Sequence, residues 1–446
     1  MMFSKPRKSR RLLATASAGV AIVLALSACS TAPAATQSTA AGPTTINFWS
    51  WNPDAGTSKP YIDAFEASHP NIKVKMRFIQ YSDYVNTTQL ALQSGSGPDV
   101  FGLQVGALTN QFAPLAEDLT PAISKQLGDD WKTKLTATDQ LAVDGKQVAL
   151  PWMITGGGLV WANQTLVDSL KLTVPTTYEE LKSFCAEVKK AKKYCIVQGA
   201  KDSWQNIDVY QAIINQVSPG TFYTAMAGKA DFSSPEFVKA FEIWKSFFSD
   251  GIFQEGALGA TAYPDANDAF HKGQAALMIN GTWQNADTTK TRLAQYTKTY
   301  GASFENNTAF MPYFFPKVAD GGATGTLFGG PDVGFAVSSA SKAKDAAETF
   351  VTWLTANAEG QKIMAKTVQQ PALSSVSLDL SDVTTPQQVT ALQAQGPALK
   401  GMIGQREIQN ADVKTALGDA LSAVASGQQS PAQAAASVQK AIAAAK

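Results

Sequence analysis

The chain has 446 residues, of which 45% are hydrophobic and 16% are charged, and its 37 basic side chains nearly balance 36 acidic ones. This length exceeds what one hydrophobic core usually serves, and it suits two domains. A formal net charge of +1 argues against a strongly basic surface, so we expect no nucleic acid and no anionic membrane surface as a partner.

The N-terminus has the composition of a secretory signal peptide, which we place at residues 1–28. Basic residues come first, an apolar run from Leu12 to Leu26 follows, and small residues precede Cys29. The sequence Leu-Ser-Ala-Cys at 26–29 resembles a bacterial lipobox and predicts diacylation of Cys29; the alternative is ordinary signal-peptidase cleavage that leaves a free thiol. Residues 29–44, rich in Ala, Thr and Ser, predict a flexible tether.

Along the rest of the chain, apolar strands alternate with amphipathic helices, which predicts an α/β architecture with largely parallel sheets. Strands are predicted at Thr45–Trp49, at Ile72–Phe78, where apolar and charged residues alternate, and at Pro98–Phe101. Helices are predicted between them, at Lys59–Ser68 and Tyr84–Gln93. This βαβαβ order favours a doubly wound sheet.

Most tryptophans outside the predicted strand ends are expected to be structural. Strand alternation favours the core for Trp49, and the helical spacing of apolar residues does the same for Trp244 and Trp353. Trp131 and Trp161 are also assigned to structural positions. The Ala- and Gln-rich stretch after Pro386 is predicted to form a set of helices.

Two cysteines remain after the predicted signal peptide, in a chain that we expect to be exported. Oxidation is the default in that compartment, so we predict a disulfide between Cys185 and Cys195; two reduced, buried thiols are the alternative. Thr176 and Glu179 have capping-box spacing, which places Cys185 on a helix. Closing the short loop would contribute roughly 2 to 3 kcal/mol in the chain-entropy view.

Signals for catalysis are weak. The sequence has no P-loop, no dinucleotide fingerprint, no His-Glu-x-x-His helix and no Gly-x-Ser-x-Gly elbow. Its two histidines, His69 and His271, both stand near predicted helix ends, which favours solvated or capping roles over catalysis. Paired carboxylates could still form a glycosidase site, because their spacing in space is not visible in a sequence.

Aromatic and amide side chains follow the first three predicted strands. Trp51 follows the first strand, Gln80 the second and Gln104 the third. Ligands of open α/β sheets bind beyond the carboxyl ends of the strands. Indole faces pack on the C–H faces of sugar rings, and amides exchange hydrogen bonds with hydroxyls. The pattern therefore favours a carbohydrate site, although another polar solute would suit the same groups.

Several spaced segments resemble family 1 of the bacterial extracellular solute-binding proteins, the relatives of maltodextrin-binding protein. They are Ser94–Val100, Gly158–Asn163, Leu172–Leu181, Lys272–Trp283 and Gly329–Val337. The sequence departs from the family at Thr155–Gly158, where relatives often place an acidic or aromatic ligand contact.

This resemblance implies an α/β, two-lobed periplasmic-binding-protein fold of the clamp-like type II, with segments exchanged between the lobes. Residues 45–150 plus 312–370 would form lobe 1, and 151–311 plus 371–446 would form lobe 2. Ligand binding would close the lobes by a hinge motion.

The function implied is the substrate-binding component of an ABC importer, monomeric and without cofactor, metal or enzymatic activity. It would bind an oligosaccharide or disaccharide and deliver it to integral-membrane permease subunits. Its place would be the extracellular face of a Gram-positive cell membrane, held by the lipid anchor. The alternatives are a secreted glycosidase and the same fold binding a non-sugar polar solute. The predicted ligand-binding residues are Trp51, Gln80, Gln104, Trp152, Trp204, which is placed in a polar loop, Trp283, which follows a strand and a Gly-containing turn, and Asp332, which could instead cap a turn.

Overall fold

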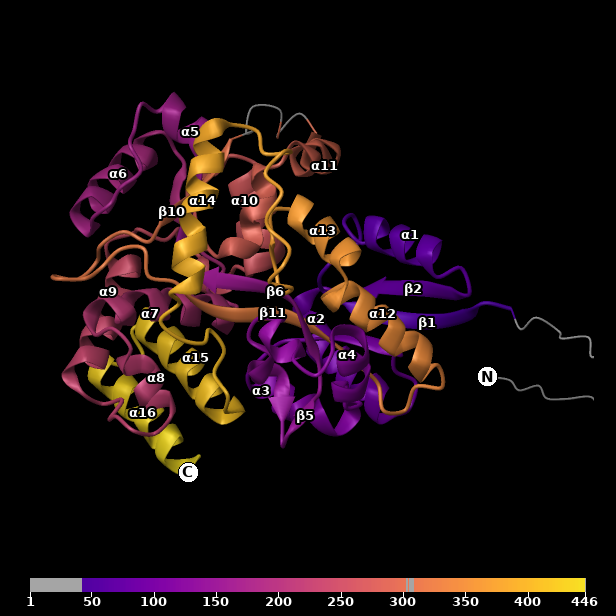
Figure 1. Cartoon of the computed structure of the whole chain (residues 1–446). Helices are drawn as coiled ribbons and strands as arrows, with labels where there is room; N and C mark the ends of the chain where they lie inside the picture. The colour runs from indigo at the N-terminus through magenta and orange to yellow at the C-terminus, as the bar shows by residue number, and fades with distance from the viewer. Residues whose placement is uncertain (1–41, 302–303, 305–308, 446) are drawn as a thin grey trace, which may run out of the picture. The chain divides into compact units, whose positions relative to one another are not determined.

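The structure is a computed structural model that describes residues 42–301, 304 and 309–445 (Figure 1). The predicted signal peptide, Cys29 and most of the predicted tether lie outside the described residues. The fold reported below is that of the unit Pro43–Lys446. Among the described helices, none combines the length and the apolar character needed to cross a bilayer.

A six-stranded sheet contains the first three predicted strands. Its order is β12-β6-β11-β3-β1-β2. The bounds are β1 Thr44–Ser50, β2 Ile72–Phe78, β3 Val100–Leu103, β6 Leu150–Gly157, β11 Phe328–Val337 and β12 Gln370–Pro371. Strands β1, β2 and β3 run parallel, whereas β11 and β12 pair antiparallel to their neighbours. The predicted βαβαβ start is confirmed, with α1 at Lys59–Ser68 and α2 at Tyr81–Gln93.

A four-stranded sheet follows, with the order β10-β7-β9-β8. The bounds are β7 Leu159–Asn163, β8 Tyr194–Val197, β9 Ala275–Asn280 and β10 Phe310–Phe314. Only β8 and β9 pair in parallel; β7 is antiparallel to both β9 and β10. The prediction of largely parallel sheets is therefore wrong. Both sheets are mixed, because strands that return from the other sheet enter in the opposite direction.

Helices cover both sheets. After α2 they are α3 Ala107–Phe112, α4 Thr120–Leu127, α5 Gln164–Ser169, α6 Tyr178–Lys190, α7 Ser203–Val217, α8 Thr221–Met226, α9 Pro235–Ser249, α10 Asn267–His271, α11 Lys290–Tyr300, α12 Lys344–Ala356, α13 Ala358–Lys366, α14 Pro386–Lys400, α15 Ala411–Ala425 and α16 Pro431–Ala444. Short strands β4 Ala142–Val143 and β5 Lys146–Gln147 form a small hairpin, and the 3-10 segment η6 spans Thr282–Thr288. The C-terminal helices α15 and α16, yellow in Figure 1, pack beside α7 and α9. The prediction of helices after Pro386 is confirmed.

Most of the tryptophans predicted to be structural are buried in the core. Trp244 is fully buried in the cluster between the four-stranded sheet and its helices, where each large apolar side chain stabilises by about 1.5–3 kcal/mol. Trp131, Trp161 and Trp353 are buried as well. The prediction for Trp49 is wrong: its ring is half-exposed, and the Arg77 guanidinium lies 4.4 Å above it. The alternate face of β1 enters the core instead, through Ile46 and Phe48.

The chain passes from the six-stranded to the four-stranded sheet at Gly158, whose φ of +96° disfavours any other residue. It returns between β10 and β11. Strands β6 and β10 thus extend a few residues past the lobe boundaries expected at 150/151 and 311/312. The division of the chain into two lobes stays a prediction.

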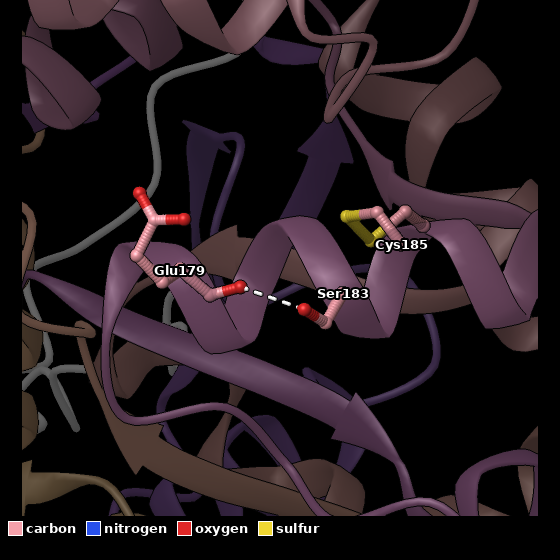
Figure 2. The surroundings of a disulfide bond; sticks show 4 residues. Glu179, Ser183 and Cys185 are labelled. Carbon is pink, nitrogen blue, oxygen red and sulfur yellow. Dashed lines mark hydrogen bonds between the residues drawn. A yellow bond between two sulfur atoms is a disulfide. The ribbon is translucent and has the colours of Figure 1, made fainter.

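The disulfide between Cys185 and Cys195 is present and joins α6 to β8 (Figure 2). The N-cap of helix α6 is Thr177, one residue later than the predicted Thr176. Thr177 accepts a hydrogen bond from the Glu180 backbone, and the Glu180 carboxylate accepts from Thr176. The run Thr-Thr-Tyr-Glu-Glu offers the same spacing in two registers, so the sequence alone left the cap ambiguous by one residue.

Candidate ligand-binding site

A cavity of about 650 Å³ is lined by residues from both the six-stranded and the four-stranded sheet. Its size falls within the range of roughly 300–1,000 Å³ that is typical of small-molecule sites. All seven residues predicted from the sequence line it: Trp51, Gln80, Gln104, Trp152, Trp204, Trp283 and Asp332. The structure brings these side chains together, and their contact with a ligand stays a prediction.

Trp51, just after β1, is held edge-on against two tyrosines of α2. Its ring lies 5.3 Å from the ring of Tyr81 and 4.8 Å from that of Tyr84, and the Tyr84 hydroxyl donates to the Gly102 carbonyl at 2.7 Å. A Cβ on Gly102 would lie 3.1 Å from the indole, so a side chain there would crowd Trp51. Trp51 is therefore positioned by α2 and β3 together.

Gln80 and Gln104 stand at the same edge of the six-stranded sheet. Gln80 occupies the N-cap position of α2, and its side chain makes no capping bond. Gln104 is buried beyond β3 and accepts a hydrogen bond from the Tyr81 hydroxyl. Both amide side chains therefore lie at strand ends, as predicted.

Trp152 differs from the other predicted tryptophans because only 2% of its surface is exposed. Its ring packs against those of Tyr61, at 5.5 Å, and Phe335, at 5.3 Å, within the core of the six-stranded sheet. Its buried indole Nε1 has no hydrogen-bond partner among the described residues. Trp152 thus lines the cavity from a core position.

Trp204, Tyr263 and Trp283 form an aromatic group on the side of the four-stranded sheet. The rings of Trp204 and Tyr263 are stacked 6.1 Å apart, and those of Trp204 and Trp283 meet edge to face at 6.3 Å. The polar loop predicted around Trp204 is wrong: Asp202 is the N-cap of α7, and Trp204 lies in its first turn. Helix α7 includes the polar residues of its first turn because the apolar residues further along the helix are buried and hold the segment in place.

Trp283 follows β9 and the turn at Gly281, as predicted, at the start of η6. Its carbonyl accepts a hydrogen bond from the Gln369 amide at 3.0 Å. The next residue back, Thr282, accepts from the Gly156 backbone N–H of β6 at 2.9 Å. Both sheets therefore hold the segment that carries this tryptophan.

Arg406, which no sequence pattern singled out, lies behind the aromatic group. Its Nε donates to both carboxylate oxygens of Asp208, at 2.9 and 3.0 Å, and its Nη1 donates to Asp332 at 3.0 Å. The guanidinium carbon is 4.4 Å from the centre of the Trp283 ring and 5.4 Å from that of Trp204, within cation–π range. Asp332 therefore pairs with a buried arginine and does not cap a turn.

The pKa values around Arg406 reflect both burial and ion pairing. Burial raises the pKa of Asp208 to about 6, against the opposing effect of Arg406. Burial likewise raises the pKa of Asp332. The pKa of Glu407 is lowered, because its bond to Lys414 at 2.6 Å and the nearby Arg406 together outweigh the effect of burial. One guanidinium is thus shared among three carboxylates.

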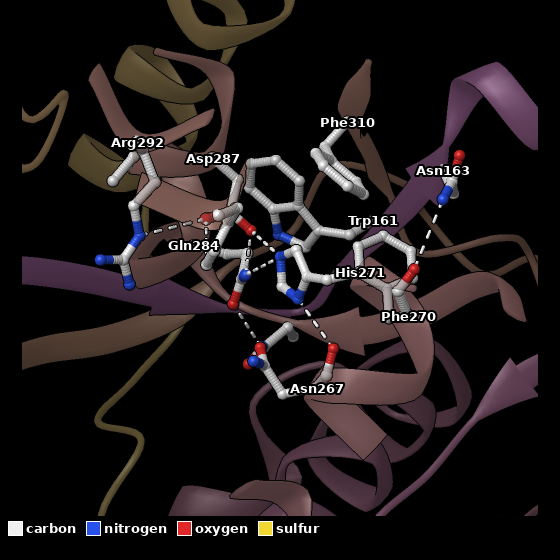
Figure 3. Close-up of polar contacts among 12 residues, drawn as sticks. Trp161, Asn163, Asn267, Phe270, His271, Gln284, Asp287, Arg292 and Phe310 are labelled. Carbon is white, nitrogen blue, oxygen red and sulfur yellow. Dashed lines mark hydrogen bonds and ion pairs between the residues drawn. The ribbon is translucent and has the colours of Figure 1, made fainter. Parts of the chain in front are cut away.

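A second charged cluster surrounds His271 (Figure 3). His271 is fully buried; its Nε2 lies 2.7 Å from Asp287 Oδ2 and its Nδ1 lies 2.7 Å from the Asn267 carbonyl. The imidazole therefore connects α10 to η6. Burial acts to raise the pKa of Asp287, but the charge and hydrogen bond of His271 outweigh it and the pKa is lowered.

The solvated role predicted for His271 is wrong, because the ring is fully buried and contacts Asp287 in η6. The capping alternative agrees with the contact of Nδ1 with the Asn267 carbonyl at the end of α10. The capping prediction for His69 is confirmed: it is the C-cap residue of α1, and its backbone N–H donates to the Phe65 carbonyl. Within the described ranges, no group of three or more His, Cys, Asp or Glu side chains could hold a metal ion.

Asp54 and Arg292 connect the two sides of the cavity. Asp54 belongs to the loop after β1 and Arg292 to α11, and their side chains form an ion pair of 3.0 Å. Arg292 also approaches Asp287 at 3.9 Å, so the His271 cluster continues to the cavity wall. Arg292 did not stand out in the sequence, because a single charged residue in a polar segment carries no pattern.

The glycines at 156–158, where relatives often place a ligand contact, are packed against β11. A Cβ on Gly157 would lie 2.6 Å from the Phe328 ring, and one on Gly156 would lie 3.1 Å from Leu327. The described cavity lining does not include these glycines. The departure from the family pattern is therefore accommodated by close packing between strands.

Comparison with solved structures defines the class of fold. A structure from work on xylan utilization by Caldanaerobius polysaccharolyticus superposes with a TM-score of 0.75 at 22% identity, covering 89% of this chain and 99% of that one. The maltose-bound MalE3 of T. maritima superposes with a TM-score of 0.68 at 18% identity, covering 90% and 100%. The chain therefore has the periplasmic-binding-protein fold predicted from its sequence.

Residues 49–361 match the family of bacterial extracellular solute-binding proteins, and the chain belongs to this family. The predictions of a binding protein and of an extracellular location are confirmed by this membership. The maltotriose-binding protein of Pyrococcus abyssi is 26% identical over 69% of this chain and 61% of its own length. For the multiple sugar-binding protein of Streptococcus mutans the identity is 26%, over 69% of each chain. An ABC transporter extracellular-binding protein of Pyrococcus horikoshii matches at 25% identity, over 50% of this chain and only 52% of the relative.

Proposed function

We propose that this chain is the substrate-binding component of an ABC importer and binds an oligosaccharide or disaccharide in the cavity between its two sheets. The observation that carries the proposal is the cavity wall, where Trp51, Trp204, Tyr263 and Trp283 stand among amides and hydroxyls. Rings of this kind bind the apolar faces of sugars while polar groups bind the hydroxyls. The names of the Pyrococcus abyssi and Streptococcus mutans relatives, which bind maltotriose and multiple sugars, support the same ligand class.

The charges of the cavity argue against the glycosidase alternative. Three carboxylates among the described residues line it, and each lies near an arginine: Asp54 and Asp287 near Arg292, and Asp332 near Arg406. Glycoside hydrolysis needs one carboxyl group that gives up a proton and a second that acts as a base or nucleophile. Each of these carboxyl groups is already engaged by an arginine, which favours a binding site over a hydrolytic one.

The test of this function is a binding panel with purified protein. Maltotriose, xylotriose, chitotriose and a galactotriose are added one at a time, and melting temperature and sugar integrity are both measured. A ligand at 100 times its dissociation constant should stabilise the fold by about 2.7 kcal/mol, and chromatography should recover it intact. Hydrolysis of a sugar would support the enzyme alternative, and a shift with amino acids or other polar solutes alone would support a non-sugar ligand.

We also propose lipid anchoring through Cys29, with residues 29–44 as a tether to the membrane that holds the permease. The support is the sequence Leu-Ser-Ala-Cys at 26–29 after an apolar run. A Cys29→Ala variant should be secreted into the medium or remain unprocessed. An unchanged membrane fraction with normal maturation would contradict the anchor.

The two lobes expected from the sequence, residues 45–150 plus 312–370 and residues 151–311 plus 371–446, form the last part of the proposal. Closure around the ligand would bring Trp51 and Trp283 to opposite faces of one sugar, by a hinge motion. Small-angle scattering with and without the tightest sugar of the panel measures this directly. A radius of gyration that does not decrease with ligand would contradict closure.

A further inference from the structure

Arg406 connects three segments that lie far apart in the sequence. Only 8% of its side chain is exposed, and it bonds Asp208 of α7 and Asp332 of β11. Its own carbonyl accepts a hydrogen bond from the Gln211 amide of α7 at 2.8 Å. Both the backbone and the side chain of Arg406 are therefore attached to α7, while its guanidinium reaches the six-stranded sheet.

The same arginine lies against two rings of the cavity wall. Trp204 and Asp208 are four residues apart on α7 and share one face of that helix, so the guanidinium that bonds Asp208 also meets the Trp204 ring. The Trp283 ring comes from η6 and lies closer, with its centre 4.4 Å from the guanidinium carbon. Arg406 thus fixes the position of two aromatic rings that come from different elements.

The charge of Arg406 is fully compensated before any ligand arrives. Its partners Asp208, Asp332 and Glu407, together with Lys414, give the cluster two cations and three carboxylates. The other charged groups of the cavity wall are paired as well, since Arg292 lies 3.0 Å from Asp54 and 3.9 Å from Asp287. The remaining lining cation, Lys298, is exposed on α11, where water screens it.

We propose that Arg406 is a positioning and specificity-determining residue of the sugar site: it holds Trp204 and Trp283 in place while Asp208 and Asp332 occupy its donors, so that the cavity selects uncharged over acidic saccharides. This inference depends on the proposed function. A uronic acid would bring a carboxylate beside a cluster that already has an excess of carboxylates, and like charges at close range disfavour binding.

The experiment compares two probes by titration calorimetry: the neutral trisaccharide that binds best in the panel, and the same trisaccharide with one ring carboxylated. Wild-type protein should bind the neutral probe at least about tenfold more tightly. Asp332→Asn frees a donor of Arg406 and should improve the relative affinity for the acidic probe by about tenfold. Asp412→Asn removes an exposed carboxylate of α15 and is the matched control, with an unchanged ratio.

Variants of Arg406 itself test the positioning role. Arg406→Gln should lower affinity for the neutral probe by about tenfold or more, and Arg406→Lys should not restore it, because an ammonium cannot donate in a planar fork to Asp208 and Asp332 together. Arg77 lies over Trp49 at the same 4.4 Å but outside the cavity, so Arg77→Gln is the matched control and should leave affinity unchanged. If Arg406→Gln does not fold, the ratio of affinities for the two probes in Asp332→Asn still tests the proposal.

The outcomes separate the two proposals. Binding of neither probe would overturn the proposed function together with this inference. Equal binding of both probes by the wild type, or an affinity ratio that Asp332→Asn leaves unchanged, would overturn the inference while the function stands.

Discussion

Two buried charged clusters flank the segment that carries Trp283, and they are built in opposite ways. The His271 cluster consists mainly of neighbours in sequence, with Asp287 in η6 and Arg292 in α11. The Arg406 cluster joins Asp208, Asp332 and Arg406, which come from α7, β11 and the segment before α15. The first cluster joins elements that follow one another along the chain, α10, η6 and α11, whereas the second joins segments that lie far apart in the sequence.

The two clusters also differ in their electrostatics. In the His271 cluster one buried carboxylate lies near both His271 and Arg292, and the pKa of Asp287 is lowered. In the Arg406 cluster one guanidinium serves several carboxylates, and burial raises the pKa of Asp208 and Asp332. We conclude that the first cluster chiefly stabilises the fold, whereas the second positions the aromatic rings and sets the charge that a ligand meets.

Removing His271 should have the largest effect on stability. His271→Ala removes a fully buried ring and its 2.7 Å contact with the buried Asp287 carboxylate, and removing one partner of a buried pair in this way costs about 3 to 5 kcal/mol. Urea unfolding followed by circular dichroism measures the change. His69→Ala, at the partly exposed end of α1, is the control and should cost less than about 1 kcal/mol. A similar loss of stability in both variants would contradict the stabilising role of the His271 cluster.

Removing Trp283 should act on binding and not on folding. Its ring is partly exposed at the cavity, so Trp283→Ala should weaken sugar binding about 10- to 100-fold and change the melting temperature of the free protein little. Calorimetry gives both quantities. Trp49→Ala, half-buried outside the cavity, should leave affinity unchanged. A lowered melt of the free protein with retained affinity would place Trp283 in the core instead.

A finer variant moves the Trp283 ring without deleting it. The backbone of Gly281, with φ −123° and ψ −170°, suits any residue, but an added Cβ would lie 2.1 Å from the Trp283 ring. Gly281→Ala should therefore lower affinity by displacing the indole. Unchanged affinity would show that the ring position does not matter for binding.

The smallest effect concerns pH. Since burial raises the pKa of Asp208 to about 6, the folded chain holds more protons than the unfolded chain between about pH 4 and 6. The contribution of this group to the free energy of unfolding therefore falls as pH rises through that window. The free energy of unfolding of the wild type minus that of Asp208→Asn should be about 1 kcal/mol larger at pH 5 than at pH 7.5. Urea unfolding at the two pH values measures it.

Arg406, Asp332 and Glu407 face Asp208 and remain in the variant, so the difference isolates the one carboxyl. Asp412→Asn, on the surface of α15, should show no such pH dependence. A stability difference that stays the same from pH 5 to pH 7.5 would mean that the Arg406 cluster holds Asp208 ionised over this whole range.

The sequence by itself determined the features that depend on local pattern. Strand and helix periodicity placed β1, α1 and β2, and the carboxyl ends of the strands pointed to Trp51, Gln80 and Gln104 as cavity residues. The spacing of apolar residues also assigned Trp244 and Trp353 to the core. These predictions succeeded because periodicity and strand direction act over a few neighbouring residues.

Only the tertiary structure decided which charges and faces meet. It turned Trp49 outward, buried His271 against Asp287 and brought Arg406 to Asp208 across 198 residues of chain. It also made both sheets mixed, since strands that return from the other sheet enter antiparallel. A pairing between distant residues depends on how whole elements pack, and no periodicity within a single element records it.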